Sequence, residues 1–585
     1  MRRHLALPTF LIALAAAPRI AAAQTFPTDD PVIKRIWALG MDSSHTEQLS
    51  HTLFDSLGPR LMGSPNLKAA QDWLVKMYTS WGIDAKNERY GTWRGWRRGY
   101  SHIDLVSPRV RSLEGTMVGY SPGTGGKDLV AAPIVLPKFS DSTEFVQWLP
   151  NVKGKLVMIS AAYPSCRPPE DWAQNATPAS QARIDSVMLG IQRDWAVVRP
   201  GPNVPKGAEG LRGTGYYPAL GGGTLGVRLE QAGAAGVITS RPKLSWRNMN
   251  AGQGGGRGGF GGGSPLGTGG WGTMEIFETY NTKAPTIALS CEDYGLVYRL
   301  TENHESPKLK LNLDAQLLGE QPVFNTIARI PGTEKPNEYV MLSAHFDSWD
   351  GSSGATDNGT GTITMMEAMR ILKQVDPHPK RTILVGHWSG EEEGEVGSAA
   401  FREDHPEVLK GLEALFNQDN GTGRIVRMSA AGLPDADPHV RAWLDKIPVE
   451  LKNQIQYGGV GGPAGGGSDD YNFSCAGLPA FGLGALNWDY GNYTWHTDRD
   501  TYDKIVFDDL ESNATLTAML AYLASEDPAF IQRVNPDSAR AAVRAQMAAN
   551  PQEAQAAGRG RGGFGGPRLW PECEKAPRST NPRLR

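Results

Sequence analysis

Apolar residues in the second half of the chain alternate between short continuous runs and stretches with a spacing of three and four. Three continuous runs predict buried strands: Glu338–Ala344, Arg381–Trp388 and Leu412–Asn417. Stretches with helical spacing lie between and after them: Thr360–Leu372, Ala399–Leu409 and Leu510–Leu523. Strands that alternate with helices predict an α/β domain with a mixed, mostly parallel sheet covered by helices.

The first half of the chain has a different pattern. Helical spacing over residues 44–81 gives way, after residue 107, to short β-rich runs separated by Gly, Pro and Asp. Because 585 residues exceed what one hydrophobic core usually serves, we expect an inserted β-rich domain at residues 107–310. The main domain then has a helical N-terminal part at residues 24–106 and its larger part at residues 311–530. A partly disordered C-terminal extension, residues 531–585, follows.

The N-terminus has the pattern of an export signal. Arg2 and Arg3 precede the apolar run Leu5–Ala17, and Ala21–Ala23 offers a cleavage site. The apolar run is shorter than the roughly 20 residues that span a bilayer. This favours a cleaved signal at residues 1–23 over an uncleaved anchor helix. We therefore expect a secreted or periplasmic protein without stable membrane insertion.

Composition narrows the partners further. A formal net charge of −3 gives no long-range attraction to nucleic acid, so we expect none as a partner. Many of the 70 glycines fall in two tracts, 252–272 and 558–567, whose composition is typical of a flexible loop and tail. The spacing of the four cysteines implies no particular pairing: Cys166, Cys291, Cys475 and Cys573.

Acidic and histidine side chains follow each of the three predicted strands. His345 and Asp347 come directly after the first strand, and Asp357 lies in a Gly-rich turn before the next helix. The second strand is followed by Glu391–Glu393 and the third by Asp419. Taken singly, Asp357 is more readily explained as a helix N-cap, and Glu391–Glu393 could be a solvated acidic turn. Because the carboxyl ends of parallel strands meet at one edge of a sheet, we expect the side chains to lie together.

The combination predicts a metal site. With His496 from a later segment, the set contains two histidines and three carboxylates, a ligand mixture that suits Zn²⁺. One carboxylate can bridge two metals roughly 3.5–4 Å apart. No His-Glu-x-x-His motif is present. The Gly-x-Ser-x-Gly match at Gly119–Gly123 is a turn, because Pro122 lacks the backbone N–H that an oxyanion hole needs.

The stretch His345–Thr501 resembles the zinc aminopeptidase and glutamate carboxypeptidase family, and within it the plasma glutamate carboxypeptidases. The blocks that carry the resemblance are His345–Asp350 and Trp388–Gly397. The resemblance implies an exopeptidase with two Zn²⁺ per chain. It also implies their ligands: His345 and Asp419 on one zinc, Glu392 and His496 on the other, and Asp357 as the bridge.

The same resemblance implies two further roles. Glu391 occupies the position of the general base, and Asp347 that of a carboxylate that orients His345. The β-rich segment resembles a protease-associated domain at Gly233–Thr239 and Ala284–Ser290. Such a domain, inserted before the catalytic part, is expected to overhang the zinc cleft and admit only chain ends.

The sequence departs from the family pattern at two positions. Asn358 follows the bridging residue where the plasma enzymes have an Asp, which is expected to alter a hydrogen bond rather than metal binding. Trp495 stands before His496, where glutamate carboxypeptidases have a Tyr, and residues 481–492 lack the arginines that hold acidic substrates. A preference for C-terminal glutamate is therefore not expected. Ser468 and Trp495 are the candidate substrate contacts.

The predicted function is that of a secreted di-zinc exopeptidase acting on small peptides, an aminopeptidase or dipeptidase that uses a metal-bridged hydroxide. Two alternatives remain: a glutaminyl cyclase-like acyltransferase with one zinc, and a non-catalytic, receptor-like binding protein. The sequence does not decide which peptide end is recognised, nor whether the protein forms a homodimer.

Overall fold

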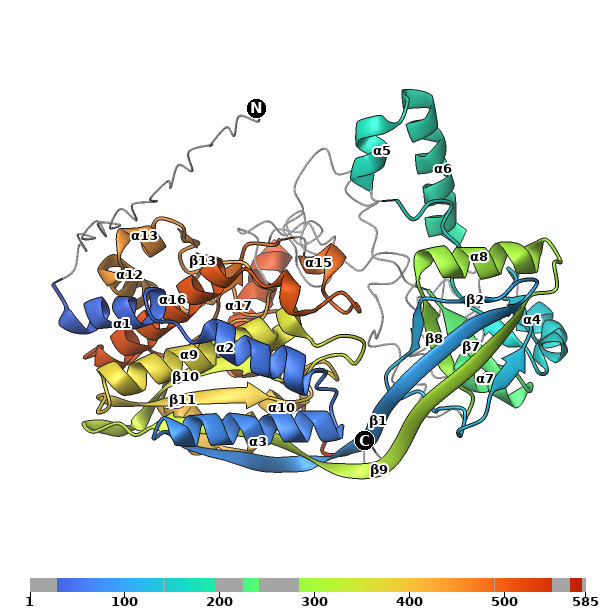
Figure 1. Ribbon diagram of the computed structural model, residues 1–585. Coiled ribbons are helices and arrows are strands. Elements are labelled where there is room, and N and C mark those ends of the chain that lie inside the picture. The colour runs from blue at the N-terminus through green and yellow to red at the C-terminus, as the bar shows by residue number, and fades with distance from the viewer. Residues whose placement is uncertain are drawn as a thin grey trace, which may run out of the picture.

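The described chain forms two lobes joined by a long pair of strands (Figure 1). The computed structural model describes residues 29–139, 142–167, 169–194, 225–240, 283–488, 490–549 and 569–580. The predicted signal segment and both glycine-rich tracts lie outside the described residues.

The larger lobe is built on an eight-stranded sheet with the order β15-β12-β10-β11-β9-β1-β2, in which β4 also pairs with β9. Four neighbouring strands are parallel: β15 (Ala480–Gly482), β12 (Leu412–Asn417), β10 (Lys335–His345) and β11 (Arg381–Trp388). The others pair antiparallel: β9 (Lys308–Ile330), β1 (Asp84–Ser107), β2 (Arg111–Ser112) and β4 (Leu129–Ala131). The predicted mixed α/β fold is thus confirmed. Three of the four parallel strands, β10, β11 and β12, correspond to the predicted apolar runs, and β15 was not predicted.

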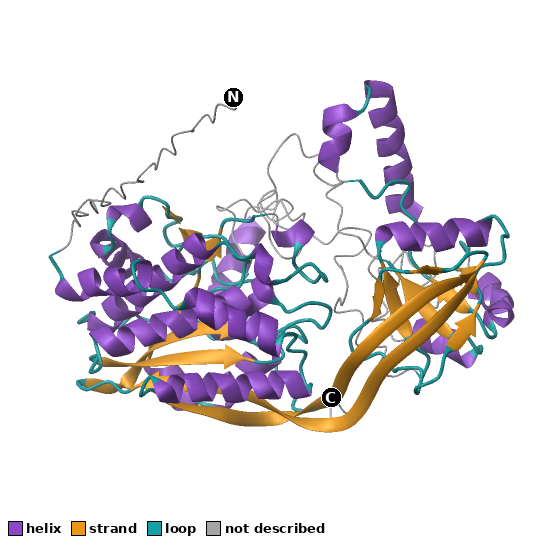
Figure 2. Cartoon of the chain, viewed as in Figure 1, coloured by secondary structure: helices purple, strands orange, loops and turns teal. Residues whose placement is uncertain are grey.

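Helices cover both faces of this sheet (Figure 2). Alternate side chains of a strand point to opposite faces, and in β10 Val340 and Leu342 join the core formed with one helix group, whereas Met341 joins the core of the other. The first group contains α1 (Pro31–Met41), α3 (Pro65–Ser80), α9 (Thr360–Val375) and α16 (Phe507–Glu526). The second contains α10 (Val396–Asp404), α11 (Pro406–Gly411) and α14 (Tyr471–Ser474).

Shorter elements complete the lobe. Its remaining helices are α2 (Thr46–Ser50), η1 (His51–Leu57), η5 (Ala355–Gly359), α12 (Ala436–Lys446), α13 (Val449–Lys452), α15 (Tyr490–Tyr493), η6 (Tyr502–Lys504) and α17 (Pro536–Ala549). A three-stranded sheet contains β13 (Ile425–Met428), β14 (Gln456–Tyr457) and β16 (Gly484–Ala485).

Two element predictions are wrong. The helix predicted at Ala399–Leu409 is divided into α10 and α11 at His405, because Pro406 disfavours the helical conformation of the residue before it. The helical part predicted to reach residue 106 ends with α3 at Ser80, and the 24-residue strand β1 follows. Interspersed arginines and glycines in β1 hide the alternation of buried positions that would have indicated a strand.

The smaller lobe carries a five-stranded sheet with the order β3-β8-β7-β6-β5. Its strands are β3 (Gly115–Met117), β5 (Pro133–Val135), β6 (Leu156–Met158), β7 (Gly236–Thr239) and β8 (Thr286–Leu289). Its helices are α4 (Ser142–Trp148), η2 (Leu149–Val152), α5 (Pro169–Asn175), α6 (Pro178–Asp194), α7 (Leu225–Gln231) and α8 (Cys291–Glu302). The paired strands β1 and β9 run under the larger lobe and then rise along the smaller lobe (Figure 1).

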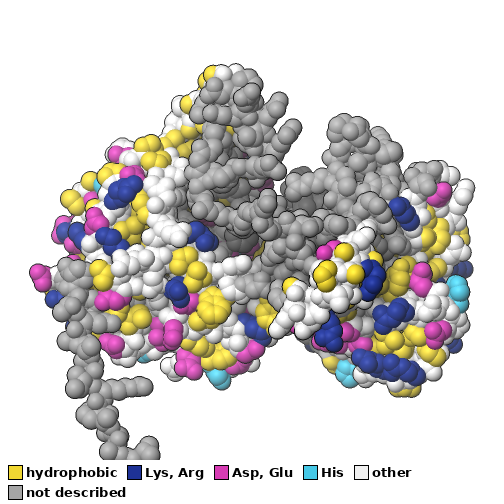
Figure 3. All heavy atoms as spheres, turned by 90° about the horizontal axis from the view of Figure 1, so that it is seen from above, with side chains coloured by type: hydrophobic (Ala, Val, Ile, Leu, Met, Phe, Trp, Pro, Cys, Tyr) yellow, Lys and Arg dark blue, Asp and Glu magenta, His cyan; other side chains and the backbone are white. Residues whose placement is uncertain are grey.

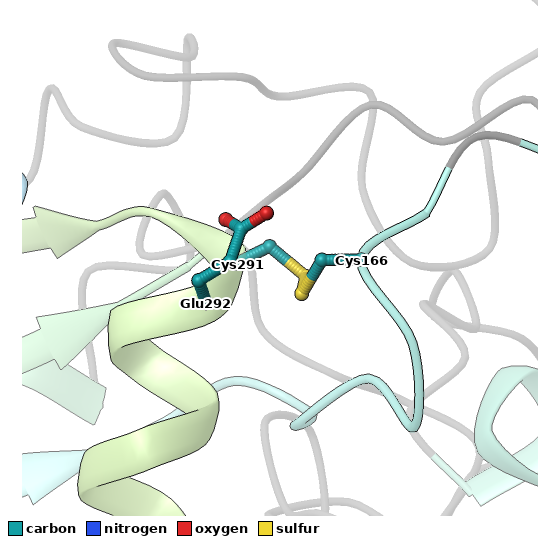
Figure 4. A group of neighbouring side chains, drawn as sticks. All are labelled: Cys166, Cys291 and Glu292. Atoms are coloured by element: carbon teal, nitrogen blue, oxygen red, sulfur yellow. A yellow bond between two sulfur atoms is a disulfide. The ribbon is translucent and has the colours of Figure 1, made fainter.

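Two disulfides pair all four cysteines, a pairing that the spacing did not reveal. Cys166–Cys291 ties the start of α8 to a loop of the smaller lobe (Figure 4). Cys475–Cys573 anchors the C-terminal segment 569–580 to the larger lobe. In that segment the buried Trp570 donates its indole N–H to the Ser474 carbonyl, and the Arg578 carbonyl accepts from the Thr92 N–H of β1.

Acidic and basic side chains are interspersed over the described part of the face shown in Figure 3. Among the described residues, no helix is both long and apolar enough to cross a bilayer.

Replacing both Cys475 and Cys573 by Ser should destabilise the larger lobe, because the bridge closes a sequence separation of 98 residues. A disulfide of this kind typically contributes about 2–4 kcal/mol. Denaturant unfolding under oxidising conditions measures the loss. The matched control is the Cys166→Ser/Cys291→Ser variant, which should affect the smaller lobe instead. An unchanged unfolding midpoint of the larger lobe in the first variant would contradict this role.

Candidate metal centre

The residues predicted to bind metal converge at the carboxyl ends of the parallel strands. Two groups of side chains could each hold a cation: His345 with Asp357 and Asp419, and Asp357 with Glu392 and His496. Within each group the potential ligand atoms lie within 4.8 Å of one another. The structure therefore brings all five residues together, with Asp357 common to both groups.

Asp357 lies between the two histidines, with one carboxylate oxygen directed to each. Its Oδ1 is 3.4 Å from His345 Nε2, and its Oδ2 is 3.3 Å from His496 Nε2. His345 Nε2 is also 3.3 Å from Asp419 Oδ1, and His496 Nε2 is 2.9 Å from Glu392 Oε2. This arrangement is that of a carboxylate placed to bridge two cations.

Several atoms of the group are buried without a hydrogen-bond partner among the described residues. They are His345 Nε2, Asp357 Oδ2 and Glu392 Oε1. Buried polar atoms are normally paired, because an unpaired one costs free energy. Imidazole nitrogens and carboxylate oxygens are also the donor atoms that zinc prefers. The residues therefore fit a bound metal.

Burial and mutual repulsion raise the pKa values of two glutamates of the site. Burial raises the pKa of Glu392 to about 7, helped by the neighbouring Asp357 charge. Burial likewise raises the pKa of Glu391 well above its usual value. Burial alone would lower the pKa of His345, but the charges of Asp419 and Glu391 raise it. The protein thus concentrates more negative charge here than it can neutralise with its own groups.

Asp500 fixes the turn that carries Asp357. Its two carboxylate oxygens accept the backbone N–H groups of Thr356 at 2.6 Å and of Asp357 at 2.9 Å. On the other side, Asn358 donates to the Gln418 carbonyl and accepts from the Gly361 N–H. The Asn that departs from the family pattern therefore joins the Asp357 turn to the segment before Asp419.

Arg60 holds the loop between His345 and Asp357. Its guanidinium is fully buried and donates to the carbonyls of Phe346, Ser353 and Gly354. Burial lowers its pKa to about 10, so the group stays charged at neutral pH, close to four site carboxylates. One cation from the N-terminal segment thus both shapes the loop and offsets part of its charge.

Asp347 contacts both the first histidine and the acidic turn. His345 Nδ1 lies 3.1 Å from the Asp347 backbone carbonyl, nearer than the 3.6 Å to its carboxylate oxygen Oδ1. The carboxylate also accepts the backbone N–H groups of Glu391 and Glu392, each at 3.3 Å. Asp347 therefore positions the acidic turn as well as the first histidine.

The three adjacent glutamates occupy different places. Glu392 belongs to the second ligand group, whereas the Glu391 carboxylate lies beside it, 3.9 Å from His345 Nε2. Glu393 turns toward the smaller lobe, where the Tyr120 hydroxyl donates to it at 2.8 Å. Glu391 is therefore the one free to act next to the ligand groups.

A second contact joins the smaller lobe to the centre. Arg98 of β1 forms an ion pair with Asp350 in the loop that Arg60 holds. The same guanidinium donates to Thr116 and to the Met117 carbonyl of β3. Movement of the smaller lobe would therefore displace the loop before Asp357 through these contacts.

The two candidate substrate contacts lie close to the ligands. The Trp495 ring stacks on the His496 ring, with 3.9 Å between centroids. The Ser468 hydroxyl accepts from Asn417 Nδ2 at 2.8 Å. Asn417 in turn accepts from Ser343, whose oxygen accepts from the Trp388 indole. Ser468 is thus held through side chains of the three central strands.

Sequence reasoning missed Arg60, Asp500 and Tyr490. Tyr490 is buried, its hydroxyl has no hydrogen-bond partner among the described residues, and burial and nearby carboxylates keep its pKa well above the usual value. Asp500 stands four residues after His496, a proximity that could have indicated it. Nothing in the pattern around Arg60 or Tyr490 distinguishes them from ordinary core residues.

Residues 325–521 match the model of Peptidase family M28. Carboxypeptidase Q from Xenopus laevis is 24% identical over 76% of this chain and 78% of its own length. The Bos taurus protein of the same name is also 24% identical, over 63% of each chain. Leucine aminopeptidase 1 from Pyrenophora tritici-repentis is 30% identical over 34% of this chain and 54% of its own length.

Among solved structures, a Peptidase M28 precursor from Shewanella amazonensis superposes with a TM-score of 0.57 at 23% identity, covering 86% of this chain and 98% of that one. The family match, the relatives and the ligand residues support a zinc metallopeptidase. The part of the chain that matches the model of Peptidase family M28, residues 325–521, contains all five potential metal ligands.

Replacing Asp500 by Asn should weaken metal binding by about 10–100-fold, because partners that orient ligands commonly contribute this much. Asn retains one acceptor oxygen and cannot receive both backbone N–H groups of the Asp357 turn. Zinc affinity is measured by competition with a chelator. Asp503→Asn, at an exposed position nearby, is the control and should leave the affinity unchanged. Equal zinc affinities in the two variants would show that Asp500 does not support metal binding.

Proposed function

We propose that the protein is a secreted exopeptidase that holds two Zn²⁺ per chain and hydrolyses peptide bonds at the ends of small peptides. The observation that carries the proposal is the pair of buried ligand groups sharing Asp357, with the Glu391 carboxylate beside them. His345 and Asp419 would hold one zinc, and Glu392 and His496 the other. When bound, zinc acts as a Lewis acid that polarises the scissile carbonyl and lowers the pKa of water.

Glu391 acts as the proton carrier. Its backbone N–H is held by Asp347, which fixes the start of the acidic turn. Its side chain is 12% exposed, more open than the ligand side chains around it. From there the carboxylate takes a proton from the attacking water and delivers it to the leaving amine.

Other residues orient the substrate. Tyr490 stays neutral, so its hydroxyl is a donor for the oxygen on which negative charge develops. Trp495 presents a flat apolar surface beside His496, which suits an apolar side chain better than an acidic one. A short peptide with an apolar terminal residue is thus the proposed substrate class.

The smaller lobe favours action on chain ends. Two of its contacts, Tyr120 with Glu393 and Arg98 with Asp350, reach the loops of the metal centre. A lobe held this close restricts access for the middle of a folded chain. We propose that this lobe is the protease-associated domain suggested by its sequence. Export is supported by the two disulfides, since such bridges persist in oxidising compartments.

Glu391→Gln should lower kcat by about 10²–10⁴-fold, the usual contribution of a general base. Both metals should remain bound, because Glu391 belongs to neither ligand group. Glu392→Gln is the matched variant one position along and should lose metal instead. Steady-state kinetics with elemental analysis of both proteins provides the test. Metal loss in the Glu391 variant would show that the two roles are reversed.

Unblocked dipeptides and tripeptides with an apolar first residue should be the best substrates, and chelation should abolish their hydrolysis until Zn²⁺ is restored. A casein-like protein should release free amino acids or dipeptides before any internal fragment appears. Mass spectrometry of early digests distinguishes the products. Internal fragments that appear without free amino acids or dipeptides would identify an endopeptidase and refute the proposal.

A further inference from the structure

A second cluster of potential ligands lies at the opposite end of β12 from the metal centre. Glu413 near the start of β12, His439 of α12 and Asp527 at the end of α16 offer atoms within 4.8 Å of one another. His439 Nδ1 is 2.9 Å from Asp527 Oδ2. The three residues come from segments far apart in sequence, so their convergence is a product of the tertiary fold.

Glu413 is the member that the protein leaves unsatisfied. Its side chain is fully buried, and Oε2 accepts the Ile531 N–H at 3.1 Å. Oε1 has no hydrogen-bond partner among the described residues. A buried carboxylate normally forms several hydrogen bonds or binds a cation. A bound cation would supply the partner that Oε1 lacks among the described residues.

The nearby guanidinium groups do not supply it. Arg381 is fully buried, but it donates to the Glu338 carboxylate and to carbonyl groups at the end of α16 and beyond. Arg533 donates to the carbonyls of Leu409, Lys410 and Leu412. Both cations approach the cluster without bonding to Glu413.

The other two members are already oriented. Asp527 Oδ2 also accepts the Trp443 indole N–H at 2.9 Å, and Oδ1 accepts the Ala529 N–H at 3.1 Å. Supporting hydrogen bonds of this kind are what hold metal-binding carboxylates in place. The cluster is therefore held in place by hydrogen bonds, and Glu413 Oε1 is its atom without a partner among the described residues.

We propose that Glu413, His439 and Asp527 bind a structural zinc ion, separate from the proposed catalytic pair. One imidazole nitrogen and two carboxylate oxygens are a ligand set for zinc. Calcium and magnesium favour all-oxygen sets with more ligands. The ion ties α12 and the segment after α16 to the start of β12, so it stabilises the larger lobe without contacting substrate.

Elemental analysis of the full-length, zinc-loaded enzyme tests this proposal. Glu413→Gln and His439→Asn should each contain one zinc per chain fewer than the wild type, unfold at a lower temperature and retain kcat/KM. His51→Asn is the control, because exposed His51 lies near Asp55 and no third potential ligand joins them among the described residues. Equal zinc content in wild type and both variants would overturn the proposal and assign Glu413 as a neutral acid.

Anomalous diffraction from wild-type crystals at the zinc edge gives an independent result, should either variant fail to fold. A peak among Glu413, His439 and Asp527 is expected, and its absence from zinc-soaked crystals overturns the proposal. The readout is separable from the catalytic claim. A peptidase without this peak would refute only the structural site, and an inactive protein with the peak would refute only the proposed function.

Discussion

Electrostatic repulsion among buried acids is the constraint on which the metal centre depends. Asp357, Glu392 and Asp419 are each no more than 5% exposed, and Glu391 lies directly beside them. Without a cation, such a group would protonate or separate. The protein resists both outcomes through many backbone hydrogen bonds and one buried guanidinium. The site is thus held ready for cations at a cost in stability that metal binding recovers.

The fold provides the means of concentrating these charges. Parallel strands β10, β11 and β12 bring their carboxyl ends to one edge, and each following turn contributes a ligand. Asp347 and Asp500 then fix the turns through backbone N–H groups rather than through the ligand side chains themselves. This leaves the carboxylate oxygens of the ligands available for metal. The smaller lobe adds its contacts at Asp350 and Glu393, next to the ligands but not among them.

Features that depend on local sequence could be predicted, and features that depend on long-range contacts could not. The strands β11 and β12 were predicted with their observed bounds, because both are continuous apolar runs. Their terminal acids were grouped correctly, since parallel strands share one ligand-bearing edge. The β1–β9 pair was not predicted, because its residues lie partly in solvent and its pairing joins segments more than 200 residues apart. Arg60 and the Cys475–Cys573 bridge join segments far apart in sequence. Such contacts leave no pattern in the local sequence, so they could not be predicted.

The central claim is that Asp357 bridges two zinc ions. A crystal structure of the zinc-loaded enzyme, with anomalous data on both sides of the zinc edge, tests it most directly. Two peaks roughly 3.5–4 Å apart are expected, one beside His345 and Asp419 and the other beside Glu392 and His496. A single peak in a fully active enzyme would contradict it.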